Sequence, residues 1–487
     1  MGPGRGVRVR RGAVVAKSDA AGAGGGEDLN IVHVAMIAGA AAMGGFLFGY
    51  DSAVINGAVS SIEEHFRVSP SVTGFTVAAA LLGSALGAAL AGGMADRLGR
   101  IRVMQIAAVL FAVSAVGSAL PFTVWDLAGW RVVGGVAIGI ASVIAPTYIA
   151  EVSPPAFRGR LASLQQLAIV LGIAMSQLVN YALASGAGGS GMGDLGPLMA
   201  WQWMLGVEVL PAIVYFLLSL VIPESPRHLV RVGRIDRARR VLREVEGGTS
   251  EDVEQRVREI REALGSEVKP RLSDLRGRYG LLGIVWVGMA LSAFQQLVGI
   301  NVIFYYSSSL WQSVGIAETD SLLLSLFTSI VNILGTFVAI ALVDRIGRKP
   351  LLLVGSAGMA VALGVTSFAF SHATVVDGQA ELSSGWALVA LVSASTFVLF
   401  FALSWGVVTW VLLGEMFPLR VRAAAMAVAT ATQWIANWLI TITFPPLSDW
   451  NLPLTYLVYT AFAALSFLFV ARYIRETKGK TLESMQA

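Results

Sequence analysis

The chain has 487 residues, of which 55% are hydrophobic and only 14% are charged, and it contains no cysteine. A soluble globular protein usually carries about 25% charged residues, so this composition indicates an integral membrane protein. The lack of cysteine excludes disulfides, thiolate nucleophiles and cysteine-ligated metal sites. The formal net charge is +4, which raises the question of whether the basic residues bind a polyanion or set the membrane topology.

The predicted elements fall into five segments. Residues 1–30 are rich in Arg and Gly without the short apolar region and cleavage site of a signal peptide, and are expected to form a disordered basic cytoplasmic tail. Residues 31–222 and 281–474 each contain six apolar segments of the roughly 20 residues that cross a bilayer. The twelve predicted spans are 31–58, 72–95, 103–122, 126–150, 160–183, 200–222, 281–308, 321–343, 350–371, 384–413, 422–445 and 453–474. Residues 223–280, rich in Arg and Glu with apolar residues at helical spacing, predict a linker of amphipathic helices, and 475–487 form a second cytoplasmic tail.

Three charged motifs occur once in each half, in the same order. DRLGR at 96–100 recurs as DRIGR at 344–348, and EVSP at 151–154 recurs as EMFP at 415–418, each followed by two arginines. PESPR at 223–227 has a weaker echo in RETK at 475–478. The repetition indicates a duplicated six-helix unit, and hence an all-α membrane protein of two six-helix halves.

The loops on the two sides of the predicted spans differ in charge. Nearly all Lys and Arg, including the whole 223–280 linker, lie on one side, whereas the other side carries acidic residues and a single basic one, Arg67. Cytoplasmic loops are enriched in Lys and Arg, so both termini are expected in the cytoplasm. The basic residues are therefore assigned to topology, and no nucleic-acid binding is expected.

Five motifs, three of which include or overlap the repeated ones, narrow the comparison: RVVGG at 131–135, PTYIAE at 146–151, PESPR at 223–227, QQLVGIN at 295–301 and ETKG at 476–479. Together they resemble the sugar porter family of the major facilitator superfamily over residues 31–483. That family includes bacterial sugar–proton symporters and the facilitative glucose transporters of animals. The resemblance implies twelve transmembrane helices and alternating access. One departure is Val407, which stands where the family often has a proline in span ten, so a kink there is not implied.

Neutral amides inside the spans predict the substrate class. A buried amide is costly in hydrocarbon unless it is paired or faces a cavity, and amides without a charge cluster suit a neutral polyhydroxylated ligand. The alternative for any one of them is a contact that joins neighbouring helices. By resemblance the sugar ligands are Gln166, Gln295, Gln296, Asn301, Asn332 and Trp410; the wider predicted site adds Phe48, Ile169, Tyr305, Trp405, Gln433, Trp434 and Asn437. On a straight helix Gln296 and Asn301 would not converge, so a break near Gly299 is expected.

Asp51, inside the first predicted span, is the candidate proton carrier. A carboxylate at that depth is expensive and is by default a functional hypothesis, and its expected partner is Arg131 in span four. Proton symporters of the resembled family carry Asp at this position, whereas its facilitators usually carry a residue that cannot titrate. The alternative is a static buried pair that orders the N-terminal half.

The repeated charges predict an ion-pair gate that holds the cytoplasmic side shut in the outward-open state; the alternative is that they only fix topology. The predicted gate comprises Asp96, Arg97, Arg100, Glu151, Arg158, Glu224 and Arg227 in the first half, with Asp344, Arg345, Arg348, Glu415, Arg420 and Glu476 in the second.

The sequence therefore predicts a proton-coupled monosaccharide importer of the plasma membrane, with glucose as first candidate. It is expected to be a monomer, without catalytic activity, metal or cofactor other than the coupling proton. The alternatives are a facilitative uniporter of the same fold and a symporter of a pentose or polyol such as xylose or inositol. A nutrient sensor would be expected to carry a long signalling tail, and only residues 475–487 follow the last span.

Overall fold

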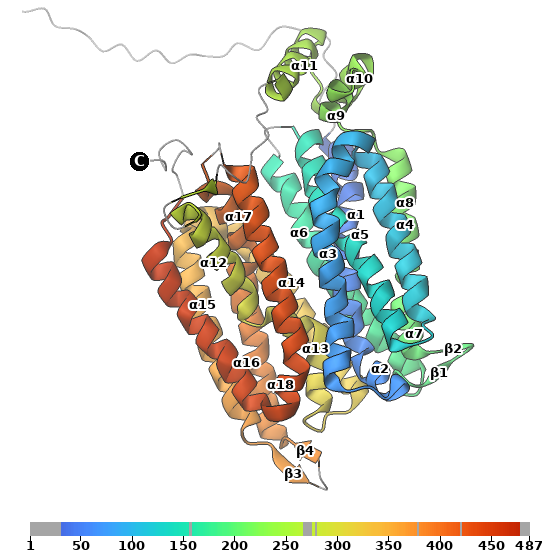
Figure 1. The fold of residues 1–487 in the computed structure, drawn as a ribbon, viewed down its shortest axis with the longest axis vertical. Helices are drawn as coiled ribbons and strands as arrows, with labels where there is room; N and C mark the ends of the chain where they lie inside the picture. Colours follow the sequence, from blue (N-terminus) through green and yellow to red (C-terminus); the bar gives the residue numbers. More distant parts are fainter. Residues whose placement is uncertain are drawn as a thin grey trace, which may run out of the picture.

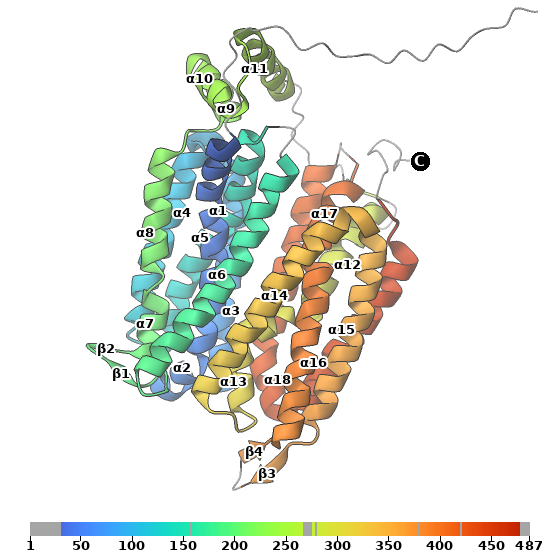
Figure 2. The same cartoon turned by 180° about the vertical axis from the view of Figure 1, so that it is seen from behind.

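Two bundles of helices lie side by side in the computed structural model, which describes residues 31–154, 158–265, 275–277, 280–376, 379–418 and 421–477 (Figures 1 and 2). The first bundle contains α1 (Ile31–Val54), η1 (Ile55–Gly57), α2 (Val59–Phe66), α3 (Pro70–Leu98), α4 (Arg100–Ala119), α5 (Val124–Val152), α6 (Arg158–Gly186), α7 (Ala200–Gly206) and α8 (Val209–Val221). The second contains α12 (Gly283–Leu297), α13 (Ile300–Gln312), α14 (Glu318–Ile346), α15 (Arg348–Phe370), α16 (Ser384–Leu403), α17 (Trp405–Met416) and α18 (Arg422–Tyr473).

The described residues contain 11 helical segments that are long and apolar enough to cross a membrane. The last of them, α18, is two helices joined at Asn451, whose backbone leaves the helical region with φ −160° and ψ 95°. Counted as two, it completes six crossings in each bundle. The predicted all-α, twelve-helix architecture is thus confirmed.

Close helix packing inside each bundle depends on small residues. A Cβ atom added at Gly135 of α5 would lie 1.9 Å from the carbonyl oxygen of Ala80 on α3, and one at Gly49 of α1 would lie 2.0 Å from that of Ile169 on α6. Only glycine allows these backbones to approach so closely, as is common between transmembrane helices. Such pairs fix how the helices that carry Asp51 and Arg131 lie against their neighbours.

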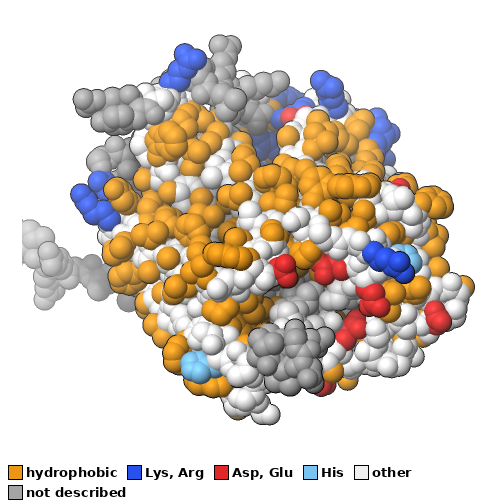
Figure 3. All heavy atoms as spheres, turned by 60° about the horizontal axis from the view of Figure 1, so that its bottom comes forward, with side chains coloured by type: hydrophobic (Ala, Val, Ile, Leu, Met, Phe, Trp, Pro, Cys, Tyr) orange, Lys and Arg blue, Asp and Glu red, His pale blue; other side chains and the backbone are white. Residues whose placement is uncertain are grey.

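The two ends of the molecule differ. At one end, here called the linker end, the short helices α9 (Pro226–Arg231), α10 (Ile235–Glu246) and α11 (Ser250–Gly265) project beyond the bundles (Figure 1). At the other, the hairpin end, two antiparallel ribbons pair β1 (Asp194–Leu195) with β2 (Leu198–Met199) and β3 (Thr374–Val376) with β4 (Gln379–Glu381). Asp and Glu gather on the hairpin-end face, with few Lys or Arg (Figure 3). The predicted tail 1–30 and residues 478–487 lie outside the described residues.

Polar contacts join the bundles near the hairpin end. The Asn56 side chain in η1 donates to Ser307 Oγ over 3.3 Å and accepts from the backbone N–H of Ser308 over 2.9 Å. The Glu318 carboxylate accepts from the N–H of Gly191 over 2.8 Å. These bonds hold the two halves together at this end.

Candidate functional site

A chain of amides runs between the helices of the second bundle. Asn301 Nδ2 donates to Gln296 Oε1 over 2.6 Å, and Gln296 Nε2 donates to Gln295 Oε1 over 3.1 Å. The same Gln295 oxygen accepts from Gln433 Nε2 on α18, while Gln295 Nε2 donates to the carbonyl oxygen of Trp405 over 3.1 Å. Four of the predicted sugar ligands therefore form one connected group that can exchange hydrogen bonds with hydroxyls.

The chain of amides depends on the predicted helix break. Helix α12 ends at Leu297, α13 begins at Ile300, and Gly299 between them adopts φ 85° and ψ 21°. A Cβ atom at Gly299 would lie 2.9 Å from the Tyr459 ring, so both backbone conformation and space favour glycine. The break turns Asn301 back onto Gln296, which confirms the expected interruption of this span.

Aromatic side chains connect the amides to the first bundle. The rings of Phe48 on α1 and Trp434 on α18 lie with centroids 6.2 Å apart. Tyr305 on α13 is buried and lies close to Ser52 on α1 and to Asn437 on α18. Residues of both bundles thus meet here, as a site at the interface between the halves requires.

Trp405 and Trp410 differ in accessibility, although both were predicted to offer a ring to the sugar. The Trp405 indole is fully buried and donates from Nε1 to Ser356 Oγ over 3.0 Å, while it is the backbone carbonyl of this residue that bonds to Gln295. Trp410 is 39% exposed. A ligand therefore cannot reach the Trp405 ring in this conformation without a rearrangement.

The remaining predicted ligands occupy α6 and α14. Gln166 is partly exposed, whereas its neighbour Gln165 is buried against Gly45 of α1. Ile169 is also partly exposed and contacts Gly49 through its backbone. Asn332 is buried, and its side-chain amide forms no hydrogen bond with any described residue. The structure gives these three no direct bond to the chain of amides.

The candidate proton carrier and its partner meet as the sequence analysis expected. The Arg131 guanidinium on α5 forms an ion pair with Asp51 and also donates to the Asp51 backbone carbonyl over 3.2 and 3.3 Å. Asp51 is 1% and Arg131 2% exposed. A Cβ atom at Gly134 would lie 2.7 Å from Asp51 Oδ2, so glycine leaves room for the carboxylate beside α5. The second carboxylate oxygen has no partner among the described residues.

A third buried charge, Glu208 between α7 and α8, was missed by the sequence analysis. It is 3% exposed, interacts electrostatically with both Asp51 and Arg131, and leaves Oε1 without a partner among the described residues. The rule that singled out Asp51, a carboxylate within an apolar span, also applies to Glu208 in the predicted span 200–222. The cluster therefore contains two buried carboxylates, and in the part of the chain that the structure describes Arg131 forms an ion pair with Asp51 and not with Glu208.

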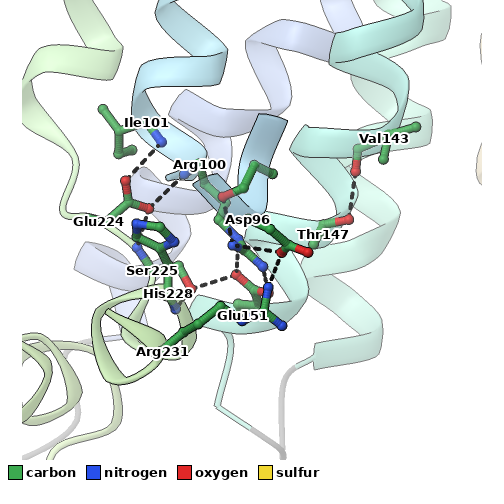
Figure 4. Close-up of polar contacts among 11 residues, drawn as sticks. Asp96, Arg100, Ile101, Val143, Thr147, Glu151, Glu224, Ser225, His228 and Arg231 are labelled. Atoms are coloured by element: carbon green, nitrogen blue, oxygen red, sulfur yellow. Dashed lines mark hydrogen bonds and ion pairs between the residues drawn. The ribbon is translucent and has the colours of Figure 1, made fainter. Parts of the chain in front are cut away.

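The repeated motifs form one polar network in each half at the linker end. In the first half, Arg100 donates to Glu151 from Nε and Nη2 over 2.8 and 2.7 Å, and Ser225 Oγ donates to the same carboxylate over 2.5 Å (Figure 4). Glu224 accepts from the backbone N–H groups of Arg100 and Ile101 over 2.9 and 3.2 Å. A carboxylate there stabilises the N-terminus of α4. Asp96 pairs with Arg231 on α9 and lies 3.7 Å from Arg100.

The second half repeats the contacts of Arg100, Glu151, Ser225 and Glu224. Arg348 donates to Glu415 from Nε and Nη2 over 3.1 and 2.7 Å, and Thr477 Oγ1 donates to Glu415 over 2.5 Å. Glu476 accepts from the N–H groups of Arg348 and Lys349 over 3.0 Å each. The weak sequence echo around Glu476 is therefore the structural equivalent of Glu224.

All ion pairs between described residues at the linker end lie within one half. Arg97 and Arg345 are exposed, and Arg227 is partly exposed. The side chains of Arg158 and Asp344, and the whole of Arg420, lie outside what the structure describes. In this conformation the networks brace each half separately.

Comparisons with known proteins agree with this architecture. The model of the family "Sugar (and other) transporter" matches residues 37–487. A glucose transport protein of Synechocystis is 54% identical over 94% of this chain and 97% of its own, and a D-xylose-proton symporter of Escherichia coli is 38% identical over 94% and 96%.

Among solved structures, the xylose transporter XylE of E. coli in a partially occluded inward-open conformation superposes with a TM-score of 0.80 at 35% identity, covering 92% of this chain and all of that one. XylE bound to 6-bromo-6-deoxy-D-glucose gives a TM-score of 0.74, with 94% and 99% covered. The chain therefore belongs to the sugar transporter family of the major facilitator superfamily.

Proposed function

We propose that this protein imports a monosaccharide together with a proton across the plasma membrane, by alternating access, with glucose as first candidate. The observation that carries the proposal is the position of Tyr305. It is buried close to both Asn437, in the predicted sugar site, and Ser52, the residue next to the buried Asp51. A sugar that reorders the amides therefore acts directly on the neighbourhood of the proton carrier.

Asp51 is the proposed site of protonation. The positive charge of Arg131 favours its ionised form, whereas a negative charge on Glu208 would favour its protonated form. One guanidinium compensates one carboxylate, so the second buried carboxylate is costly unless it carries a proton. A conformational change that separates Asp51 from Arg131 would favour proton uptake by Asp51, and re-forming the pair would favour release. The alternative is a uniporter in which this cluster is only structural.

The conformation supports an alternating-access cycle. Polar contacts join the halves near the hairpin end, and the ion pairs of Glu151 and of Glu415 at the linker end each lie within one half. The higher similarity to the inward-open XylE agrees with a state open at the linker end. In the outward-open state we propose that the predicted gate residues meet across the halves at this end.

The relatives favour a sugar but differ in which one. The most similar relatives reported above are named for glucose and for xylose, and an arabinose-proton symporter of Bacillus subtilis is 35% identical over 93% of this chain. Glucose is the first candidate because the relative named for glucose has the higher sequence identity, 54%, against 38% and 35% for the xylose and arabinose symporters. Pentoses and inositol are the alternatives. We further propose a monomer in the plasma membrane, with the basic linker end in the cytoplasm and no cofactor besides the proton.

Reconstitution into vesicles tests proton coupling. A proton moving down about 100 mV contributes about 2.3 kcal/mol, and at about 1.4 kcal/mol per tenfold that supports about 50-fold accumulation of labelled glucose. Asp51→Asn should abolish accumulation yet leave exchange of labelled for unlabelled sugar. The matched control is Asp194→Asn, at an exposed carboxylate of the hairpin end. Full accumulation by Asp51→Asn would refute the assignment.

A further inference from the structure

A basic pocket of about 630 Å³ lies at the linker end, on the outer side of the first half and away from the sugar site. Its walls come from the end of α3, the start of α4, the end of α8, and helices α9 and α10. The lining arginines are Arg97, Arg102, Arg234, Arg237 and Arg240. None of the family motifs and none of the transport chemistry uses Arg234, Arg237 or Arg240.

Three of the lining arginines lie at the start of α10 and are called the α10 row. Arg234 is the residue that precedes the helix, and Arg237 and Arg240 lie within it at a spacing of three, so that they are neighbours on its surface. Arginines on other faces of the linker are neutralised: Arg239 pairs with Asp236 and Glu254. By contrast, none of the five lining arginines has a carboxylate oxygen within 4.0 Å among the described residues. The row is thus left with its charge uncompensated.

The acidic residues of the pocket are already engaged. Glu224 accepts the two N–H groups that begin α4, and Glu244 pairs with His33 of α1 over 2.7 Å. His228 is buried at the inner wall, where burial lowers the pKa of its imidazole and keeps it neutral near pH 7. The pocket therefore has five arginines and two carboxylates, and both carboxylates already have other partners. Because positive charge is in excess, the pocket favours an anion.

The remaining wall is apolar and continues onto the surface that faces lipid. Ile101, Leu220 and Ile222 line the pocket. Leu220 is 58% exposed, and its neighbour Leu217 on α8 is 54% exposed, as expected of side chains in contact with hydrocarbon. Because α8 ends at Val221 and α4 begins at Arg100, the pocket lies where the bilayer core gives way to headgroups.

We propose that this pocket binds the phosphate group of an anion, and that its first source is a negatively charged phospholipid of the adjacent leaflet. Arginine is well suited to phosphate because its guanidinium donates two parallel hydrogen bonds. The acyl chains would follow the apolar surface of α4 and α8. A phosphate bound by arginines of α4 and α10 would bridge these two helices and so stabilise the contact of the linker with the first half. A soluble phosphate ester carries the same group and is the other source to test.

The full-length protein in detergent, titrated with dioleoylphosphatidylglycerol and followed by native mass spectrometry, tests the site. The pocket variant is Arg234→Gln with Arg237→Gln and Arg240→Gln. The matched control removes the same charge from exposed linker positions outside the pocket, by Arg243→Gln, Arg258→Gln and Arg261→Gln. All six side chains are exposed, and size-exclusion profiles verify that both variants fold. Parallel titrations use dioleoylphosphatidylcholine and sn-glycerol 1-phosphate.

We expect the pocket variant to bind phosphatidylglycerol at least about tenfold more weakly than the parent, a change of about 1.4 kcal/mol, and the control to bind as the parent does. Preference for phosphatidylglycerol over glycerol phosphate assigns the lipid, and the reverse assigns a soluble ester. Equal phosphatidylglycerol affinity in both variants would overturn the site. So would equal affinity of the parent for phosphatidylcholine and phosphatidylglycerol.

Discussion

Replacing Arg131 by leucine should destabilise the protein strongly, because it leaves a carboxylate buried without its counter-charge. Asp51 is 1% exposed and its second oxygen already lacks a partner among the described residues. Removing one member of a buried ion pair costs about 3–5 kcal/mol. At about 1.4 kcal/mol per tenfold, the ratio of folded to unfolded protein would fall by between two and almost four powers of ten.

A double-mutant cycle separates the missing charge from the lost packing. Asp51→Asn with Arg131→Leu removes both charges, and neutral replacements of a buried pair are often close to neutral in stability. The double variant should therefore recover most of what Arg131→Leu loses. The assay is the apparent melting temperature of the purified protein, followed by size-exclusion of heated samples. Losses that simply add across the two single variants, or an Arg131→Leu variant as stable as the parent, would refute the reasoning.

Three further predictions concern the linker end and the sugar site. Gly99→Ala forces alanine into φ 93° with its Cβ 2.3 Å from a Glu224 oxygen and should cost about 1–3 kcal/mol; Gly92→Ala, with open space around it, should leave the melting temperature unchanged. Gln296→Leu should weaken glucose binding about tenfold by removing one hydrogen bond to the sugar, measured by equilibrium binding to protein of unchanged melting temperature. Because burial lowers the pKa of His228 in the folded state, the unfolded chain takes up its proton first. The melting temperature should then fall as the pH drops below about 6.5. In His228→Gln the fall in melting temperature between pH 7.5 and 5.5 should be smaller than in the parent, and an equal fall in both would contradict the prediction.

Much of the fold was predictable because transmembrane helices are specified by length and apolarity alone. The duplicated motifs also predicted equivalent positions, and the matching partners of Arg100 and Arg348 bear this out. The break at Gly299 followed from one glycine. The break between α16 and α17 at Ser404 did not, since it occurs without the proline that the family often carries at the position of Val407.

The face of each helix that packs against its neighbours was harder to predict. A span that is apolar all round gives no periodic signal for its orientation, so Trp405 could not be distinguished from Trp410 as the buried ring. The same holds for adjacent Gln165 and Gln166, of which only the second is partly exposed. Glu208 could have been found from its sequence context.

The central claim is that sugar and proton move together through Asp51. Its most direct test is the external pH of a weakly buffered suspension of de-energised cells that express the protein, after separate additions of glucose, xylose, galactose and inositol. The account predicts alkalinisation with at least one sugar, glucose first, and none with Asp51→Asn. Equilibration of labelled sugar without any pH change in the parent would contradict proton coupling and leave the Asp51–Arg131 pair a structural element of a uniporter.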